Sequence, residues 1–169
     1  TQQTYDEAWC MAQILSLFSK ATQEEAEFYN DWKTERPQFR GRISERDWEG
    51  LFHEEEDIRI GKIFEAITPA ARKAKIDALK QKGELPVLVA EYRQDPQTTT
   101  VSFANAFWQA REVLAIAETP QLYTRADIPG GMAAVPAEPP ASVAGQGVLQ
   151  GLGPFEQAFI AGKHLAMYR

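Results

Sequence analysis

The chain has 169 residues, 44% of them hydrophobic, and a formal net charge of −6. This length and composition fit one globular domain, and a single cysteine excludes an internal disulfide. The charge is uneven: residues 1–57 hold 14 acids and 6 bases (−8), 58–118 hold 7 and 9 (+2), and 119–169 hold 3 of each. An acidic first third disfavours a protein that binds nucleic-acid duplexes and suits a basic partner.

The chain shows no signal for a membrane or for export. Its apolar runs are shorter than the roughly 20 residues of a membrane-spanning helix, and no signal peptide is visible. We therefore expect a cytoplasmic protein with no membrane span. The missing initiator Met leaves a processed or trimmed N-terminus open.

The stretch 5–32 lies in the longest run without Gly or Pro and predicts one long helix. Thr4 is its expected N-cap. Apolar residues form two stripes between 8 and 18 but only one after Ala21, so the helix should begin inside the molecule and end at its surface. We expect the later helices to pack against it.

Two further helices are expected, over 44–67 and 68–82. Ser44 begins the first with a pattern close to a capping box. Pro69 is typical of a first helical position, so a separate, basic helix should follow. Gly83 should end it as a left-handed cap.

The stretch 85–103 has two alternatives. β-branched residues on both sides of a turn at 94–97 favour a small β-hairpin. Equally, Pro86 could begin a short helix that ends before Pro96. After this stretch, apolar residues at helical spacing over 102–118 predict a helix that forms the core together with the first one.

Pro and Gly are concentrated in residues 119–153, where we expect no regular helix or strand. Nine apolar residues are spread through this stretch, more than a flexible linker should carry. We therefore expect an extended strap over the helices or over another chain, with 122–128 docked and 133–147 mobile or awaiting a partner. A terminal helix over 155–168 should turn Phe155, Phe159, Ile160 and Leu165 inward.

Together these patterns predict a mainly α fold. A compact helical domain of about five helices should cover 1–118, with a possible small β-hairpin at 85–103. The Pro/Gly-rich strap (119–153) and a C-terminal helix (154–169) packed on or near the core should follow.

Glu49, His53 and Asp57 are the best candidates for a metal site. Their spacing of four residues would place them on one face of a helix, and His with carboxylates can hold a transition metal. The sequence shows no further group of residues that would complete the metal ligands. His53 could instead form salt bridges on a solvated acidic face. We expect no cofactor and no change in metal content in a His53→Ala variant.

No catalytic motif is complete. A Gly-x-Ser-x-Gly elbow is absent, and the Gly-rich pieces at 145–147 and 151–153 lack the preceding strand and following Lys of a phosphate loop. Cys10 lies on an apolar stripe, which favours an inert core thiol. His164, on the last helix, is better explained by core packing or a surface contact than by catalysis.

These observations favour a non-catalytic protein-binding module: an adaptor, an inhibitor or immunity-type protein, or an accessory subunit. We expect another protein as the partner and no nucleic acid. The expected binding surface combines acidic helical residues with apolar residues of the strap: Glu54, Glu55, Glu56, Leu122, Tyr123, Val135 and Leu149. The alternative is an enzyme with a carboxylate and His site centred on 49–57, with or without a metal.

Overall fold

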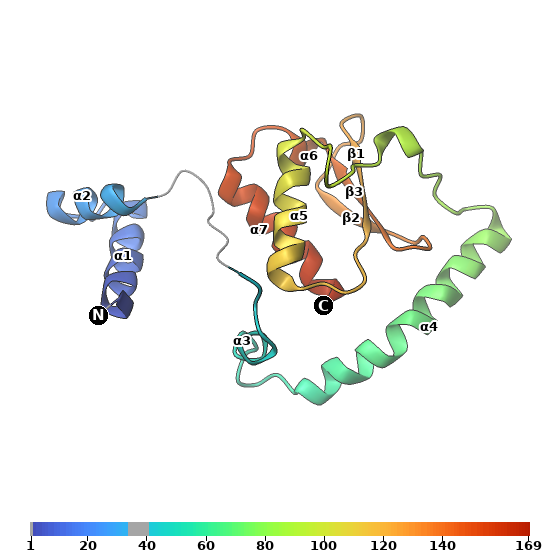
Figure 1. The fold of residues 1–169 in the computed structure, drawn as a ribbon, viewed down its shortest axis with the longest axis horizontal. Coiled ribbons are helices and arrows are strands. Elements are labelled where there is room, and N and C mark those ends of the chain that lie inside the picture. The colour runs from blue at the N-terminus through green and yellow to red at the C-terminus, as the bar shows by residue number, and fades with distance from the viewer. Residues whose placement is uncertain (1, 34–40) are drawn as a thin grey trace. The chain divides into compact units, whose positions relative to one another are not determined.

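The computed structural model describes residues 2–33 and 41–169. It divides into two compact units, Thr1–Gln38 and Phe39–Arg169. The first holds two helices, and the second holds five helices and a three-stranded sheet (Figure 1). Of the described residues, 56% lie in helices and 9% in strands of a three-stranded sheet. The fold therefore combines α and β, and the predicted mainly α fold is wrong.

The first unit consists of α1 (Gln2–Leu17) and α2 (Gln23–Trp32). The single helix predicted over 5–32 is therefore wrong. The hydroxyl of Thr22 accepts a hydrogen bond from the backbone N–H of Glu25 (3.3 Å), and the Glu25 carboxylate accepts one from the Thr22 N–H (2.8 Å). This capping box begins a new helix where the apolar pattern alone predicted continuation.

The two helices of this unit meet through their aromatic residues. The indole N–H of Trp9 donates to the carbonyl of Tyr29 (3.3 Å), and the ring centroids are 5.6 Å apart. Ala12 is buried, whereas Cys10 is exposed, so the prediction of a core thiol is wrong. Helix α1 and the helix that begins at Ser102 belong to different compact units.

Helix α3 (Glu45–Glu49) is the first helix of the second unit. Ser44 caps it as predicted: its hydroxyl accepts from the backbone N–H of Asp47 (3.2 Å) and donates to the Asp47 carboxylate (2.5 Å). The helix then ends at Gly50, so the prediction of a helix over 44–67 is wrong in its extent.

Helix α4 (Ile58–Lys82) has 25 residues and continues through Pro69. Asp57 caps its start, and Gly83 ends it in the left-handed conformation (φ 69°), as predicted for that glycine. Pro69 removes one backbone hydrogen bond. The bonds on either side keep the helix intact, so the boundary predicted before Pro69 is wrong.

Residues 85–103 form neither the predicted hairpin nor the alternative, a short helix from Pro86 to before Pro96. Their regular structure before Ser102 is one 3₁₀ turn, Ala90–Tyr92. The backbone N–H of Gln94 donates to the carbonyl of Leu122 (2.8 Å), so this stretch is fixed by contact with a strand that follows later in the chain.

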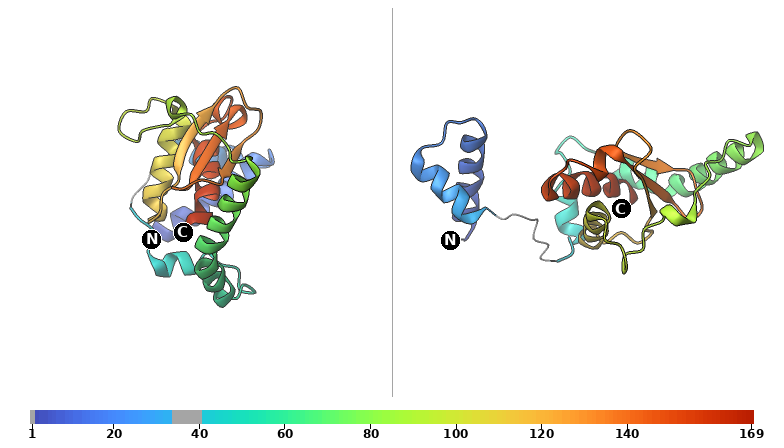
Figure 2. Two further views of the ribbon diagram at one scale, coloured as in Figure 1. Left: turned by 90° about the vertical axis from the view of Figure 1, so that its right-hand side faces the viewer. Right: turned by 90° about the horizontal axis from the view of Figure 1, so that it is seen from above.

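The helices predicted over 102–118 and 155–168 are present. Helix α5 (Ser102–Leu114) ends earlier than predicted because Ala115 adopts the left-handed conformation (φ 52°). Helix α7 (Pro154–Leu165) packs beside α5. Figure 2 shows α5, the strands and α7 grouped together, with most of α4 outside that group.

The inward face of α7 agrees with the prediction for Leu165, which is buried, and for Ile160, which is half-buried against the core, but not for the two phenylalanines. Phe155 and Phe159 are exposed. The buried residues of this helix recur at spacings of four, three and one, on the neighbouring stripe: Gln157, Ala161, His164 and Leu165.

Three short strands lie in the stretch 119–153, so the prediction of an irregular strap is wrong. Strand β1 (Gln121–Arg125) pairs in parallel with β3 (Ala141–Gly145). Strand β2 (Met132–Val135) pairs antiparallel with the other side of β3, which gives the order β1-β3-β2. The prolines of this stretch all lie outside the strands, where they limit strand length without preventing pairing. A short helix, α6 (Gln146–Leu149), follows β3.

The core of the second unit lies between α5, α7 and the sheet. Phe103 and Phe107 come from α5, Leu122 from β1 and Leu165 from α7, and all four side chains are almost fully enclosed. Helices and sheet therefore bury each other's apolar faces.

Candidate functional site

The three residues predicted to bind a metal do not share a helix. Glu49 ends α3, His53 lies in the non-helical stretch after it, and Asp57 caps α4. Arg59 pairs with Asp57 at 2.7 Å, and this hydrogen-bonded contact lowers the pKa of the Asp57 carboxyl. In residues 2–33 and 41–169, no group of three or more His, Cys, Asp or Glu side chains could hold a metal ion.

The residues predicted to bind a partner fall into two groups. Glu54, Glu55 and Glu56 are exposed, in the segment just before α4. The apolar ones lie in or beside the core: Leu122 and Tyr123 are buried, and Val135 and Leu149 are half-buried. The large apolar side chains that are exposed therefore lie elsewhere.

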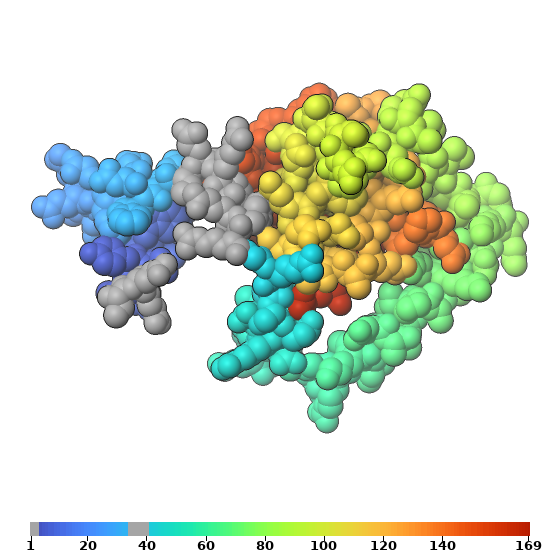
Figure 3. All heavy atoms as spheres, viewed as in Figure 1, coloured from blue at the N-terminus to red at the C-terminus, as the bar shows by residue number. Residues whose placement is uncertain are grey.

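Helix α4 presents a row of exposed apolar side chains. At 100° per residue they span about 120° of the helix circumference, and at 1.5 Å per residue they cover a length of about 27 Å. The residues of this α4 stripe are Ile60, Ile63, Phe64, Ile67, Ala70, Ala71, Ala74 and Ala78. Ile63 and Phe64 are each 60% exposed. In the space-filling view of Figure 3, α4 forms an outer edge of the second unit.

The opposite side of α4 contacts the rest of its unit. Ile76, about 180° around the helix from the centre of the α4 stripe, is 2% exposed. Leu79 and Arg72, on the same side, are half-buried, and Arg72 pairs with Glu118 at 2.8 Å. The second half of α4 is thereby anchored with the α4 stripe turned away from the core.

Charge is polarised along this part of the chain. The segment 45–57 holds seven acids and one base, giving −6, whereas 72–82 holds five bases and one acid, giving +4. All the charged residues of 45–57 are exposed. One end of α4 therefore follows an acidic segment, and the other end is basic.

Arg169 fixes the start of the acidic segment. Its guanidinium pairs with Glu45 at 2.8 Å, lies 5.0 Å from the ring centroid of Trp48, and donates to the carbonyl of Leu114. The Arg169 side chain is only 7% exposed. Its contacts therefore link α3 to the end of α5 at a position that is partly shielded from solvent.

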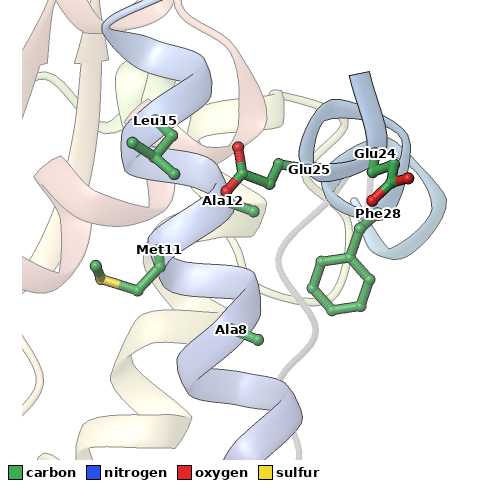
Figure 4. A pocket seen from close by; sticks show the side chains of 7 residues that line it. All are labelled: Ala8, Met11, Ala12, Leu15, Glu24, Glu25 and Phe28. Carbon is green, nitrogen blue, oxygen red and sulfur yellow. The ribbon is translucent and has the colours of Figure 1, made fainter. Parts of the chain in front are cut away.

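An open hollow lies between α1 and α2 (Figure 4). It is lined mainly by apolar side chains: Ala8, Met11, Ala12, Leu15, Glu24, Glu25 and Phe28. Glu25 is already engaged in the capping box with Thr22. The lining contains no His, Lys or Arg that would complete an acid–base pair or an anion site.

A buried polar cluster in the second unit was not predicted. Ser142 Oγ lies 2.8 Å from His164 Nε2 and 3.5 Å from the hydroxyl of Tyr168. Ser142 is 0% and His164 7% exposed, so the core encloses this pair and no substrate reaches the hydroxyl. Ser142 was not among the predicted residues because the stretch 119–153 was expected to be irregular. Its signal was the run 141–144, which has no Pro or Gly.

Comparisons with known proteins show no family: no protein-family model, curated protein or solved structure matches the chain. None of the helices in the described ranges is long and apolar enough to cross a membrane. Within those ranges, the α4 stripe is the candidate site because it is apolar, continuous and exposed.

Proposed function

We propose that the chain is a non-catalytic protein-binding module whose binding surface is the α4 stripe with the acidic segment 45–57 beside it. The observation that carries the proposal is the exposure of four large apolar side chains on one face of α4: Ile60, Ile63, Phe64 and Ile67. Contiguous apolar patches on soluble proteins commonly mark interaction sites. Each such side chain contributes roughly 1.5–3 kcal/mol if a partner covers it fully.

The form of this surface fits a helix as the partner. The α4 stripe is narrow and follows the spacing of three and four residues that helix-on-helix packing uses. Alanines in its second half let a partner helix approach closely, whereas the isoleucines and Phe64 in its first half need small residues opposite. The partner is thus an amphipathic helix with small residues at one end and bulky residues at the other.

Charge supports a defined direction for that helix. The acidic segment 45–57 attracts a basic partner region, and the basic end of α4 attracts an acidic one. Glu54, Glu55 and Glu56 keep their expected role here, although the apolar contacts come from α4 instead of the stretch 119–153.

The enzymatic alternative centred on 49–57 stays a prediction, and the contacts of that segment do not favour it. Arg59 engages the Asp57 carboxylate, and His53 Nδ1 accepts from the backbone N–H of Glu55 (3.2 Å). Both side chains therefore have local structural roles.

Photocrosslinking in the native cells tests the proposal. A benzophenone amino acid that replaces Phe64 in the full chain should crosslink to a peptide from an amphipathic helix, identified by mass spectrometry. The matched control replaces Lys62, which is exposed on the opposite side of α4. Labelling that is equal at the two positions, or absent at position 64, would contradict the proposal.

A further inference from the structure

We propose that the helix covering the α4 stripe is α4 of a second copy of this chain, packed antiparallel. This inference rests on the proposed function and names its partner. Three properties of the segment 45–82 carry it: the order of its side-chain sizes, the charges beside the α4 stripe, and the charges at its two ends.

Side-chain size along the α4 stripe is self-complementary in the antiparallel direction. Its large residues lie in the first half of α4 and its alanines mainly in the second. With the two-fold axis at the level of residue 69 along both helices, each of three large residues faces an alanine of the second copy: Ile60 faces Ala78, Phe64 faces Ala74, and Ile67 faces Ala71. Large side chains set against small ones interdigitate, and symmetry repeats each pair.

A parallel pair of the same helices lacks this fit. It places Phe64 against Phe64 and Ala74 against Ala74 of the second copy. One end is then crowded while the other leaves a gap, and both reduce contact in an interface that requires close packing. Size complementarity therefore selects the antiparallel arrangement.

Charged residues beside the α4 stripe match in the same register. Arg59 and Asp77 are exposed and lie 18 residues apart, which is about five turns, so they occupy the same edge of the α4 stripe. In the antiparallel pair, Arg59 of each copy lies beside Asp77 of the other. Exposed pairs of this kind contribute little stability, but they discriminate between alternative arrangements.

The net charges at the two ends of α4 point to the same arrangement. Antiparallel packing brings the segment 45–57 of each copy (−6) towards 72–82 of the other (+4). Parallel packing instead brings the two acidic segments 45–57, each with a net charge of −6, towards each other, where they repel. The acidic residues 54–56 and the basic end of α4 thus belong to one interface.

Sedimentation equilibrium of the full chain tests the association. The native chain should be a dimer. Ile67→Glu buries a carboxylate near the axis in both copies and should weaken dimerisation about 100-fold or more. Lys62→Gln, the matched control, lowers the net charge by the same one unit on the opposite face and should dimerise normally. Because Ile67 is exposed in the single chain, circular dichroism should show both variants folded.

Disulfide trapping tests the direction. In a Cys10→Ser background, which removes the single native cysteine, the double variant Ile60→Cys, Ala78→Cys should form covalent dimers. Ile60→Cys alone should not, because the two copies of position 60 lie about 27 Å apart in the antiparallel pair. Covalent dimers from Ile60→Cys alone would indicate parallel packing and overturn the proposal.

The remaining outcomes separate this inference from the proposed function. A native chain that stays monomeric, or a dimer that Ile67→Glu leaves intact, overturns the second-copy proposal. If the monomeric chain still crosslinks through position 64, and not 62, to an amphipathic helix of another protein, the protein-binding function stands. If crosslinking is also independent of the face of α4, both are overturned.

Discussion

His164 illustrates how enclosure changes the chemistry of a single side chain. Burial lowers the pKa of its imidazole below the ordinary value of 6.5. Its ring lies 5.8 Å from that of Tyr168, and Ser142 Oγ is within hydrogen-bond distance of Nε2. The folded chain therefore favours the neutral ring, whereas the unfolded chain binds a proton near pH 6.5.

This difference predicts a loss of stability in acid. Because the unfolded state binds more protons, the contribution of His164 to the free energy of unfolding is present above pH 6.5 and is lost as the pH falls below it. The loss is at most about 1.4 kcal/mol per pH unit for one group. Denaturant unfolding at pH 7.5 and 5.5 should show a larger loss for the native chain than for His164→Gln. An equal loss would show that His164 does not titrate with folding.

At the scale of elements, the predicted signals for helix ends were right at some positions and wrong at others: Thr4 lies inside α1 and Pro69 inside α4. Ser44 and Gly83 do cap helices, and a helix begins at Ser102 as expected. The first helix was overextended because apolar spacing continues past the turn, while the capping box at Thr22 marks a new start. The spacing argument for Glu49, His53 and Asp57 required a helix that continues past Gly50, and α3 ends there.

The strands and the binding surface were harder to predict. The many Pro and Gly residues of 119–153 predicted an irregular stretch, but the spacing between them leaves room for strands of four or five residues. For α4, the sequence contains apolar residues on two sides of the helix. Ile76 is buried because its side of α4 meets the core, and Ile63 is exposed because its side does not. The local sequence does not determine which side of the helix meets the core.

The end of β3 gives a prediction at this scale. A Cβ on Gly145 would lie 2.8 Å from the carbonyl oxygen of Gly130 and 2.9 Å from that of Ile128. Backbone hydrogen bonds hold these segments together: the N–H of Gly145 donates to the carbonyl of Gly131 (3.0 Å), and the next N–H to that of Ile128 (2.9 Å). Gly145→Ala should therefore lower the free energy of unfolding by about 1–3 kcal/mol.

Gly162→Ala is the control for that measurement. Gly162 lies inside α7, and a Cβ there has no neighbour within 4 Å. Alanine in a helix interior should raise the free energy of unfolding by roughly 0.5–1 kcal/mol. Denaturant unfolding of both variants should show opposite signs. Equal effects would mean that the approach of 128–131 to β3 does not constrain position 145.

In the whole molecule, the stretch 119–153 belongs to the core of the second unit. Its central strand is paired on both sides, and Leu122 and Ala144 are fully buried. Because the apolar residues of 119–153 are used in the core, they no longer serve as evidence for a partner-binding surface in this stretch. The support for partner binding now comes from α4, where large apolar side chains remain exposed.

Limited proteolysis distinguishes a core strand from a loose strap. Elastase accepts small aliphatic residues, and these occur both at 87–90, where Val87 is 82% exposed, and at 141–144 in β3. The first cuts should fall at 87–90, because cleavage needs exposed backbone that can open locally. Cleavage at 141–144 that is as fast as at 87–90 would contradict the sheet.

The strand order has a consequence for biosynthesis. Strand β3 is the last of the three in the chain, yet it is the neighbour that β1 and β2 share. A ribosome releases the chain from its N-terminus, so β1 and β2 emerge before the strand that pairs them. Until residue 145 has emerged, the nascent chain carries two strands with open hydrogen-bonding edges, and α7 follows later still. This interval is when chaperones have the most exposed backbone to bind on the growing chain.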